Sequence, residues 1–286
     1  SLDALQPTGP RLPETVQEAL SAYIAYARSR LAATTLRNYG IISRMLEHYP
    51  PAPLHSLDSQ AVQALYAHLA QGLLPRHGKV KAAGTLVEPN TAASRISRVR
   101  KALRWARAEG CTIPGAIDSF KPRTQHTTPG DFLYLDELDA LASVELTGRT
   151  ARARDRWLLQ AYTGLSDADM RALGARHITP GTMLTIRRKK TGSEARIPLT
   201  PQAQALLARY GGTPPAFSNQ EANRLIKAAA QKAGLVRRTD TGLPLHQVIA
   251  THTARRTFAV RALRAGLRFE EVARMMGHST LNMVLK

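Results

Sequence analysis

The sequence has a single cysteine, Cys111, among its 286 residues, so it can form neither an internal disulfide nor a zinc site built on cysteines. It has no apolar run of about 18 residues, as a membrane-spanning helix requires, and no secretory signal pattern opens it. It also lacks a glycine-rich phosphate loop ending in Lys and Ser or Thr, and any cluster of metal ligands. These absences disfavour ATPases and two-metal nucleases. We expect a cytoplasmic protein that needs no metal, nucleotide or other cofactor.

Acidic residues are scarce relative to basic ones. The chain holds 40 Lys and Arg against 21 Asp and Glu, which gives a formal net charge of +19, and both halves of the chain share the excess. Such a balance predicts a polyanionic partner that binds by displacing counterions from a phosphate backbone, and double-stranded DNA is the partner we favour. Ribosomal association or an arginine-rich coding bias would produce a similar composition.

Helical periodicity and breaks rich in proline and glycine divide the chain into parts. Residues 1–12 predict a loose N-terminal segment, residues 13–117 a helical DNA-binding domain, residues 118–131 a linker, and residues 132–286 a second, catalytic domain. The first domain should contain four helices, near residues 13–30, from 34 or 35 to before Pro50, from 58, and over 90–109. The expected fold class is mainly α with a small β-hairpin (α+β).

Basic side chains recur at steps of three along the helix predicted at 90–109, with no acidic residue before Glu109. A face of this kind suits a DNA groove, where it would contact phosphates first. A solvated helix face that binds nothing would give the same pattern. The DNA contacts that we predict are Arg95, Arg98, Lys101, Arg104 and Arg107 on this helix and Lys121 and Arg123 in the linker.

The most informative stretch lies near the C-terminus and reads H-x-x-R-R-T-F-A, followed by G-H-S. His252 and Arg255 are three residues apart, which places them on one face of a helix that Thr251 would cap. His278 follows in the G-H-S triplet. A guanidinium can bind two phosphate oxygens, and imidazoles can donate a hydrogen bond or carry a proton. Together they could stabilise a phosphoryl transition state without a metal. An isolated H-x-x-R pair is common on solvated helices, but the whole combination is far more specific.

This combination resembles the C-terminal box of the tyrosine recombinases, the phage integrase family. The resemblance implies two domains that form a C-shaped clamp around DNA, and a tyrosine that attacks the scissile phosphate to give a 3′-phosphotyrosyl link. It also implies self-association to a tetramer on DNA, with accessory DNA-bending proteins as possible partners. In the family the tyrosine follows the G-H histidine by about nine residues, which is position 287 here, and no tyrosine follows Tyr210. We expect that the natural protein continues past Lys286 and that the printed chain does not cleave DNA.

One catalytic position departs from the family pattern. The stretch T-G-L-S at 163–166 resembles the family motif T-G-L-R, so Ser166 stands where the first catalytic arginine is expected, and Asp169 fits the acidic position of the motif. Ser at an N-cap with Asp three residues later also predicts a capping box. A branch of the family found among integrases of mobile elements carries T-G-L-S as well, and this chain resembles that branch.

A β-hairpin is predicted over residues 183–199, with its turn at 191–193. Alternation places Arg188 and Lys190 on one face. The triplet K-T-G resembles the hairpin lysine of the family, so the resemblance makes Lys190 the general acid. Arg188 is the predicted substitute for the missing arginine, ahead of Arg171 and Arg176. DNA-backbone binding without catalysis would also explain this basic run. The predicted catalytic set is Arg188, Lys190, His252, Arg255, His278 and Asp169.

Two other functions remain open. A recombinase-fold protein that binds DNA without cutting it would also tolerate Ser166 and would need no tyrosine. A type IB topoisomerase-like enzyme shares the same chemistry, although the short chain and the G-H-S triplet favour a recombinase. The residue at position 287 discriminates a cutting enzyme from a binding protein.

Overall fold

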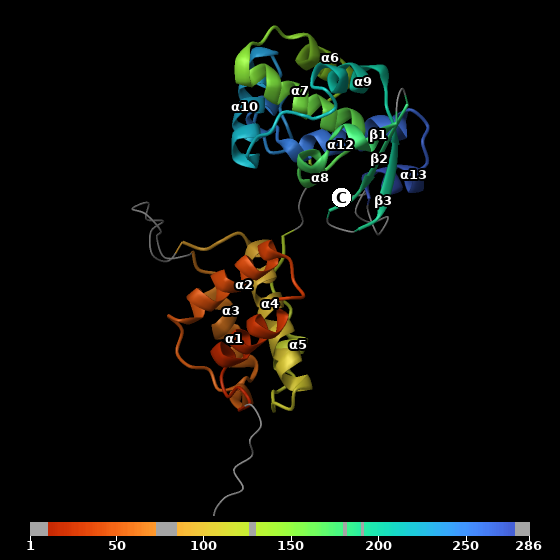
Figure 1. Ribbon diagram of the computed structural model, residues 1–286. Helices are drawn as coiled ribbons and strands as arrows, with labels where there is room; N and C mark the ends of the chain where they lie inside the picture. Colours follow the sequence, from red (N-terminus) through yellow and green to blue (C-terminus); the bar gives the residue numbers. More distant parts are fainter. Residues whose placement is uncertain (1–10, 73–84, 126–129, 180–181, 190–191, 278–286) are drawn as a thin grey trace, which may run out of the picture. The chain divides into compact units, whose positions relative to one another are not determined.

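The computed structural model describes residues 11–72, 85–125, 130–179, 182–189 and 192–277. The chain divides into two compact units, Ser1–His126 and Thr127–Lys286, and each has a hydrophobic core of its own. The structure is mostly helical with one small sheet, which confirms the predicted fold class (Figure 1). The segment predicted to be loose, residues 1–12, lies outside the described residues except at its end.

The first unit is a set of helices packed around one apolar core. All four helices predicted from periodicity are present, and α1 packs against α4. Capping side chains define the starts of α1 and α3, where Thr15 Oγ1 accepts from the Glu18 N–H at 3.2 Å and Asp58 Oδ1 accepts from the Ala61 N–H at 2.8 Å. The elements are α1 (Val16–Ala27), α2 (Ala33–Leu46), η1 (Leu54–Ser56), α3 (Ser59–Leu69), α4 (Pro89–Ala108) and α5 (Ala116–Ser119).

The chain that leaves α5 runs back along α4 and is held there by side chains of that helix. Arg100 donates to the Phe120 carbonyl at 2.5 Å. The Asn90 amide pairs with the backbone of Gln125 in both directions, donating to its carbonyl at 2.9 Å and accepting from its N–H at 3.0 Å. The linker predicted over 118–131 therefore begins too early, because residues 118–125 pack as part of the first unit.

The second unit contains eight α-helices, one 3-10 turn and three strands within the part of the chain that is described. Its strands form an antiparallel sheet in the order β1-β2-β3. The elements are α6 (Leu135–Ser143), α7 (Gly148–Thr163), α8 (Asp167–Ala172), η2 (Ala175–His177), β1 (Ile178–Thr179), β2 (Met183–Arg187), β3 (Glu194–Pro198), α9 (Pro201–Arg209), α10 (Asn219–Lys232), α11 (Leu245–Val248), α12 (Thr251–Arg264) and α13 (Phe269–Met276).

Helix α7 is the centre of the second unit. Every residue from Ala153 to Thr163 is buried, and α9, α10 and α12 pack around the helix (Figure 1). The indole N–H of Trp157 donates to the Ala250 carbonyl at 2.8 Å, and Ala250 is the N-cap of α12. This bond joins α7 to the start of the helix that carries the H-x-x-R box, so the position of that box depends on the core.

The predicted hairpin is confirmed as β2 and β3. Leu184 lies opposite Ile197 and Ile186 opposite Ala195, and these four side chains are buried on the face that joins the core. A short additional strand, β1, extends the sheet on the other side of β2. The alternation continues past β2, because Arg187 is exposed whereas Arg188 is buried.

No helix among the described residues has the length and apolar character needed to cross a membrane.

Candidate active site

Arg188 lies just after β2 and is almost completely buried, with 3% of its surface exposed. Its Nη1 forms an ion pair with Asp169 Oδ2 at 3.0 Å, and its Nη2 donates to the Met275 carbonyl at the end of α13. Its Nε is also buried and has no hydrogen-bond partner among the described residues. The Nε atoms of Arg156 and Arg261 are also buried without a hydrogen-bond partner among the described residues, so this feature is not specific to Arg188.

Asp169, on the first turn of α8, fixes Arg188 in place. Its Oδ1 accepts from the Lys189 N–H at 3.0 Å, and its Oδ2 accepts from the Ser166 hydroxyl at 2.7 Å. Burial alone would raise the pKa of this carboxyl, but the hydrogen bonds from Lys189, Ser166 and Arg188 lower that pKa below its ordinary value. Asp169 therefore stays ionised and holds one guanidinium.

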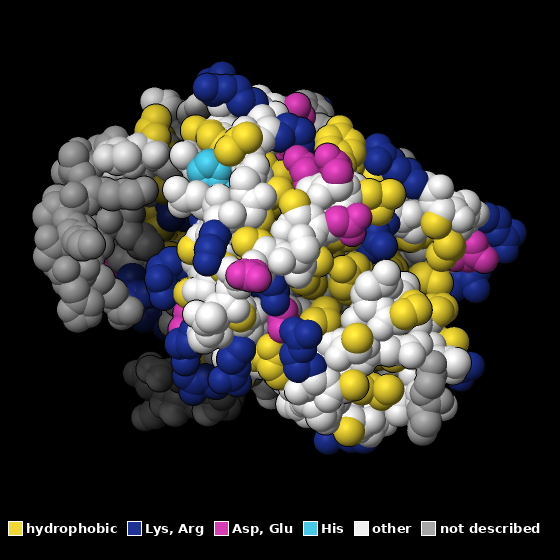
Figure 2. All heavy atoms as spheres, turned by 90° about the horizontal axis from the view of Figure 1, so that it is seen from above, with side chains coloured by type: hydrophobic (Ala, Val, Ile, Leu, Met, Phe, Trp, Pro, Cys, Tyr) yellow, Lys and Arg dark blue, Asp and Glu magenta, His cyan; other side chains and the backbone are white. Residues whose placement is uncertain are grey.

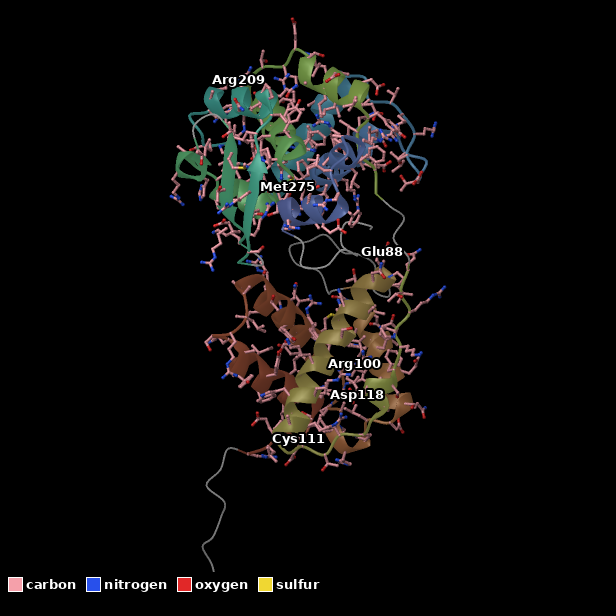
Figure 3. All side chains as sticks on the ribbon, turned by 90° about the vertical axis from the view of Figure 1, so that its right-hand side faces the viewer. Glu88, Arg100, Cys111, Asp118, Arg209 and Met275 are labelled. Carbon is pink, nitrogen blue, oxygen red and sulfur yellow. The ribbon has the colours of Figure 1, made fainter. Side chains whose placement is uncertain are left out.

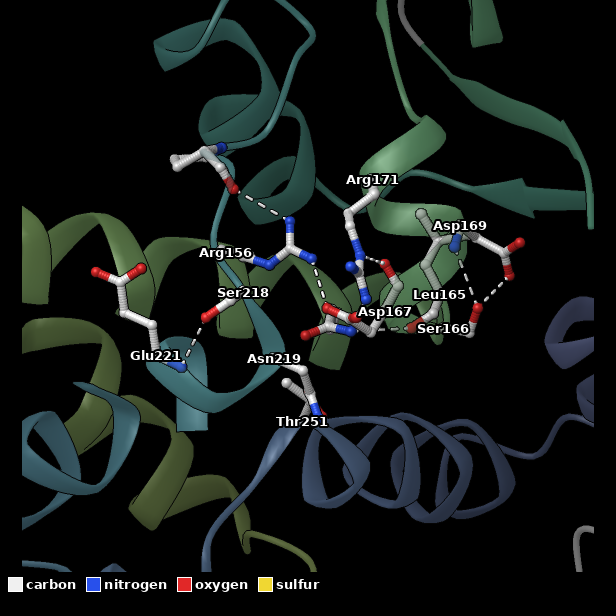
Figure 4. A network of polar contacts seen from close by, with 12 residues as sticks. Arg156, Leu165, Ser166, Asp167, Asp169, Arg171, Ser218, Asn219, Glu221 and Thr251 are labelled. Atoms are coloured by element: carbon white, nitrogen blue, oxygen red, sulfur yellow. Dashed lines mark hydrogen bonds and ion pairs between the residues drawn. The ribbon is translucent and has the colours of Figure 1, made fainter. Parts of the chain in front are cut away.

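Ser166 caps α8, as the sequence predicts. Its hydroxyl oxygen accepts from the Asp169 N–H at 3.2 Å while its proton is donated to the Asp169 carboxylate (Figure 4). A serine cannot supply the charge of an arginine, but it leaves the carboxylate free to bind a guanidinium that comes from the sheet. The structure thus brings Arg188 to the acidic residue of the T-G-L-S motif.

Arg255 approaches the same place from α12. Its Nη1 donates to the Gly164 carbonyl at the end of α7, and its Nη2 donates to the Met276 carbonyl at 3.1 Å. Burial first, and the positive charge of Arg188 second, lower the pKa of Arg255 to about 10. Arg188 and Arg255 donate to the consecutive carbonyls of Met275 and Met276, so they share one site.

Two helix C-termini supply the carbonyl oxygens of this site. Helices α7 and α13 end at Gly164 and Gly277, and both glycines have a left-handed backbone, with φ of 64° and 66°. The last carbonyls of a helix carry partial negative charge, so they attract cations. They are neutral overall, however, and Asp169 is the one carboxylate paired with Arg188 among the described residues. The site thus brings a second guanidinium, that of Arg255, beside the pair of Arg188 and Asp169.

The structure gives less information on the other predicted catalytic residues, His252, Lys190 and His278. His252 is exposed on the first turn of α12, one helical turn before Arg255. Lys190 and His278 lie outside the described residues. The prediction that Thr251 caps α12 is wrong, because Ala250 is the N-cap and the helix begins at Thr251. Thr251 instead donates its backbone N–H to Asn223 of α10 at 2.9 Å.

The two reserve candidates for the missing arginine do not reach the site. Arg171 is 53% exposed and pairs with Asp167 on its own helix (Figure 4). Asp167 also binds Arg156 of α7 at 2.8 Å, so this carboxylate belongs to a separate network. Arg176 is exposed on η2. Arg188 is the arginine that the fold brings to Asp169.

The basic face predicted on α4 requires correction. Arg95 is buried and donates to the Leu69 and Gln71 carbonyls at 2.6 and 2.8 Å. Arg104 and Arg107 both pair with Asp118, each at 2.6 Å. The helix itself has no acid here, but α5 brings one to it, which the sequence pattern of a single helix cannot reveal; Figure 3 labels Asp118 beside α4.

Four of the predicted DNA contacts, all on the first unit, form no ion pair among the described residues, whereas Arg104 is exposed as well but pairs with Asp118. Lys101 is exposed and Arg98 is half-buried on α4, where Arg98 also donates to the Ser94 carbonyl at 2.9 Å. Lys121 and Arg123 are exposed on the segment after α5. Figure 2 shows one face of the molecule, on which Lys and Arg side chains are mixed with Asp and Glu, so the net charge forms no single continuous patch there.

Sequence reasoning missed the backbone groups of the site. The carbonyls of Gly164, Met275 and Met276 and the N–H of Lys189 contact the reactive side chains directly. No side-chain pattern identifies such groups. The only signal was indirect, because Gly164 and Gly277 each mark the end of a helix, and helix ends present free carbonyls.

The second unit thus combines a small antiparallel sheet and a helical core with two arginines that donate to carbonyls at helix ends. Residues 131–286 match the model of the phage integrase family. The chain therefore belongs to the phage integrase family, the family of tyrosine recombinases.

Individual relatives agree with this assignment. Over 164 residues the chain is 27% identical to tyrosine recombinase XerC of Pelobacter propionicus, covering 54% of this chain and 53% of that protein. The chain thus spans about half the length of this curated relative. Among solved structures, the Tn1549 transposon integrase in complex with a circular intermediate DNA has a TM-score of 0.73 at 16% identity, covering 96% of this chain and 94% of that one. A lambda integrase dimer bound to a core site has a TM-score of 0.70 at 21% identity, covering 95% and 94%. The structural likeness concerns the fold.

Proposed function

We propose that the protein is a site-specific DNA recombinase that cuts and rejoins duplex DNA through a 3′-phosphotyrosine intermediate. The observation that carries the proposal is the pair Arg188 and Arg255, whose guanidiniums donate to the consecutive carbonyls of Met275 and Met276. A scissile phosphate bound beside them would be an anion that both guanidiniums attract. Both guanidiniums would then stabilise the charge that develops on the non-bridging oxygens.

The chemistry needs a nucleophile, which we place at a tyrosine in position 287. Its oxygen would form a bond to phosphorus while the bond from phosphorus to the 5′-oxygen breaks. Lys190 would give its proton to the departing 5′-oxygen, and His252 or His278 would take the proton of the tyrosine. A second 5′-hydroxyl then reverses the step. The phosphate bond energy is kept in the covalent link, so the reaction consumes no ATP.

The partners follow from this reaction. Strand exchange joins two duplex sites and uses four active sites, so we propose that the protein assembles as a tetramer on DNA, with DNA-bending proteins as possible helpers. Lys101, Arg98, Lys121 and Arg123 are the side chains of the first unit that we propose as phosphate contacts. They would position the DNA without reading its sequence.

A trapping experiment tests the proposal. A protein extended to a tyrosine at position 287 is incubated with a nicked suicide substrate of its native site, and the covalent adduct is measured by denaturing gel. The 286-residue chain and a version with phenylalanine at position 287 are the controls. We expect an adduct with tyrosine alone. An adduct with the 286-residue chain would refute the nucleophile, and DNA binding without any adduct would favour a recombinase-fold protein that does not cut.

A further inference from the structure

The last residue before the undescribed C-terminal segment, Gly277, lies directly against Arg188. Its φ is +66°, and a Cβ atom added to it would stand 2.7 Å from Arg188 Cγ and 2.9 Å from Arg188 Nε. Carbon atoms do not approach so closely, so any side chain at this position would displace the arginine or the end of α13. Because residue 277 has no side chain, Arg188 can pass close to the C-terminal end of α13.

Gly277 lies next to the guanidinium of Arg188, whose N–H groups are the donors that an anion would require. The Nη1 and Nη2 atoms of Arg188 are already bonded, to Asp169 and to the Met275 carbonyl. Nε is the donor of this guanidinium that lacks a partner among the described residues. A methyl group at 277 would occupy the space beside that donor. The neighbouring carbonyl of Met276 holds Arg255, so a shift of this helix end would move both arginines.

We propose that Gly277 is a positioning residue for the phosphate site: its lack of a side chain lets Arg188 pass along the end of α13, where the carbonyls of Met275 and Met276 hold Arg188 and Arg255 together. This inference rests on the proposed function, because it takes the anion between the two arginines to be a phosphate. It assigns to the glycine of the G-H-S triplet a role in substrate binding beyond ending a helix.

The chain offers a matched control for the backbone effect. Gly234 follows α10, as Gly277 follows α13, and has a φ of +73°. No described heavy atom lies within 4 Å of the position that its Cβ would take. Alanine at either position suffers the strain of a left-handed backbone, but only at 277 does it also meet Arg188. Asparagine tolerates a left-handed backbone better than alanine, so Gly277→Asn keeps the contact with Arg188 while reducing the strain.

The test is a titration with inorganic phosphate, followed through the Nε–H resonances of arginine side chains by NMR, with the 286-residue chain and its variants. In the unsubstituted chain we expect saturable shifts of the Arg188 and Arg255 resonances. Gly277→Ala and Gly277→Asn should each weaken phosphate binding by about tenfold or more, as expected when a charge-assisted hydrogen bond is lost. Gly234→Ala and Gly234→Asn should bind phosphate as the unsubstituted chain does.

A double substitution separates positioning from general stability. With Arg188→Ala the clash no longer exists, so adding Gly277→Ala should weaken phosphate binding no further. Equal phosphate affinity in the unsubstituted chain and in both Gly277 variants would overturn this inference and leave the proposed function standing. No phosphate-dependent shift at Arg188 or Arg255 in the unsubstituted chain would overturn the phosphate site itself, and the inference with it.

Discussion

The guanidinium groups of Arg188 and Arg255 donate to consecutive carbonyl oxygens, those of Met275 and Met276, at the end of one helix; Figure 3 labels Met275. The two arginines come from a strand end and from a helix, 67 positions apart in the sequence. One short helix end therefore holds both guanidiniums. Under the proposed function, this shared support would let Arg188 serve where the family motif carries an arginine after T-G-L.

Replacing Arg188 should lower the rate of DNA cleavage much more than it lowers the affinity for DNA. Arg188→Lys keeps the charge next to Asp169 but loses the planar fork of donors. We expect a protein that folds and binds DNA, with a cleavage rate lower by about 10³-fold, as for other arginines of phosphoryl-transfer sites. Single-turnover cleavage by the tyrosine-complete protein measures it. Arg171→Lys is the matched control, and a parental rate in Arg188→Lys would show that another group supplies the charge.

Ser166 should contribute more to stability than an ordinary cap. Ser166 and Ser218 each accept from the backbone N–H three residues on, at 3.2 Å, but only Ser166 is seen to donate to a carboxylate as well. Ser218→Ala should cost about 1 kcal/mol of unfolding free energy. Ser166→Ala should cost about 1 to 2 kcal/mol more, because Asp169 loses a partner. Urea denaturation of both variants measures the difference, and equal losses would mean that the second bond has no energetic value.

The carboxylate of Asp169 should make the second unit sensitive to acid. Its folded-state pKa is lowered from the ordinary value of 3.8, so the ionised form stabilises the fold. The sign follows from proton linkage: this stabilisation is complete above pH 3.8 and is lost as the pH falls through the lower, folded-state pKa. Asp169→Asn should therefore be less stable than the unsubstituted chain at neutral pH, and the gap should narrow in acid. Denaturation curves from pH 7 to pH 2 check this, and a constant gap would contradict it.

Substitutions on α4 should separate phosphate contacts from structural arginines. Lys101→Ala should weaken binding to every duplex and flatten the salt dependence by about one unit, because one phosphate contact is lost. Arg95→Ala should instead destabilise the first unit, since two backbone carbonyls lose a buried donor. Mobility shifts at several salt concentrations, together with thermal unfolding, distinguish the two outcomes. An unchanged salt slope in Lys101→Ala would remove this residue from the DNA surface.

The sequence predicted the elements well because the apolar residues recur with clear periods. The four long helices of the first unit, the hairpin and the cap at Ser166 follow from local chemistry alone. The alternation of the hairpin continues to Arg188, which the structure shows to be buried like Ile186 of β2. What the sequence could not supply are contacts between elements distant in the chain, such as Asp118 with Arg104 or Met275 with Arg188. The pattern of α4 alone also could not show that three arginines of its predicted basic face, Arg95, Arg104 and Arg107, are engaged within the first unit.

The buried Arg95 has a consequence for protein engineering. Arg95 holds the Leu69 and Gln71 carbonyls, while Gly72 donates to the Thr85 carbonyl at 2.7 Å and Val87 donates to the Ala70 carbonyl at 2.8 Å. These bonds tie the end of α3 to the chain before α4, whatever connects them. A redesign of the exposed face of α4 should therefore retain Arg95, because this side chain also holds the junction between α3 and α4.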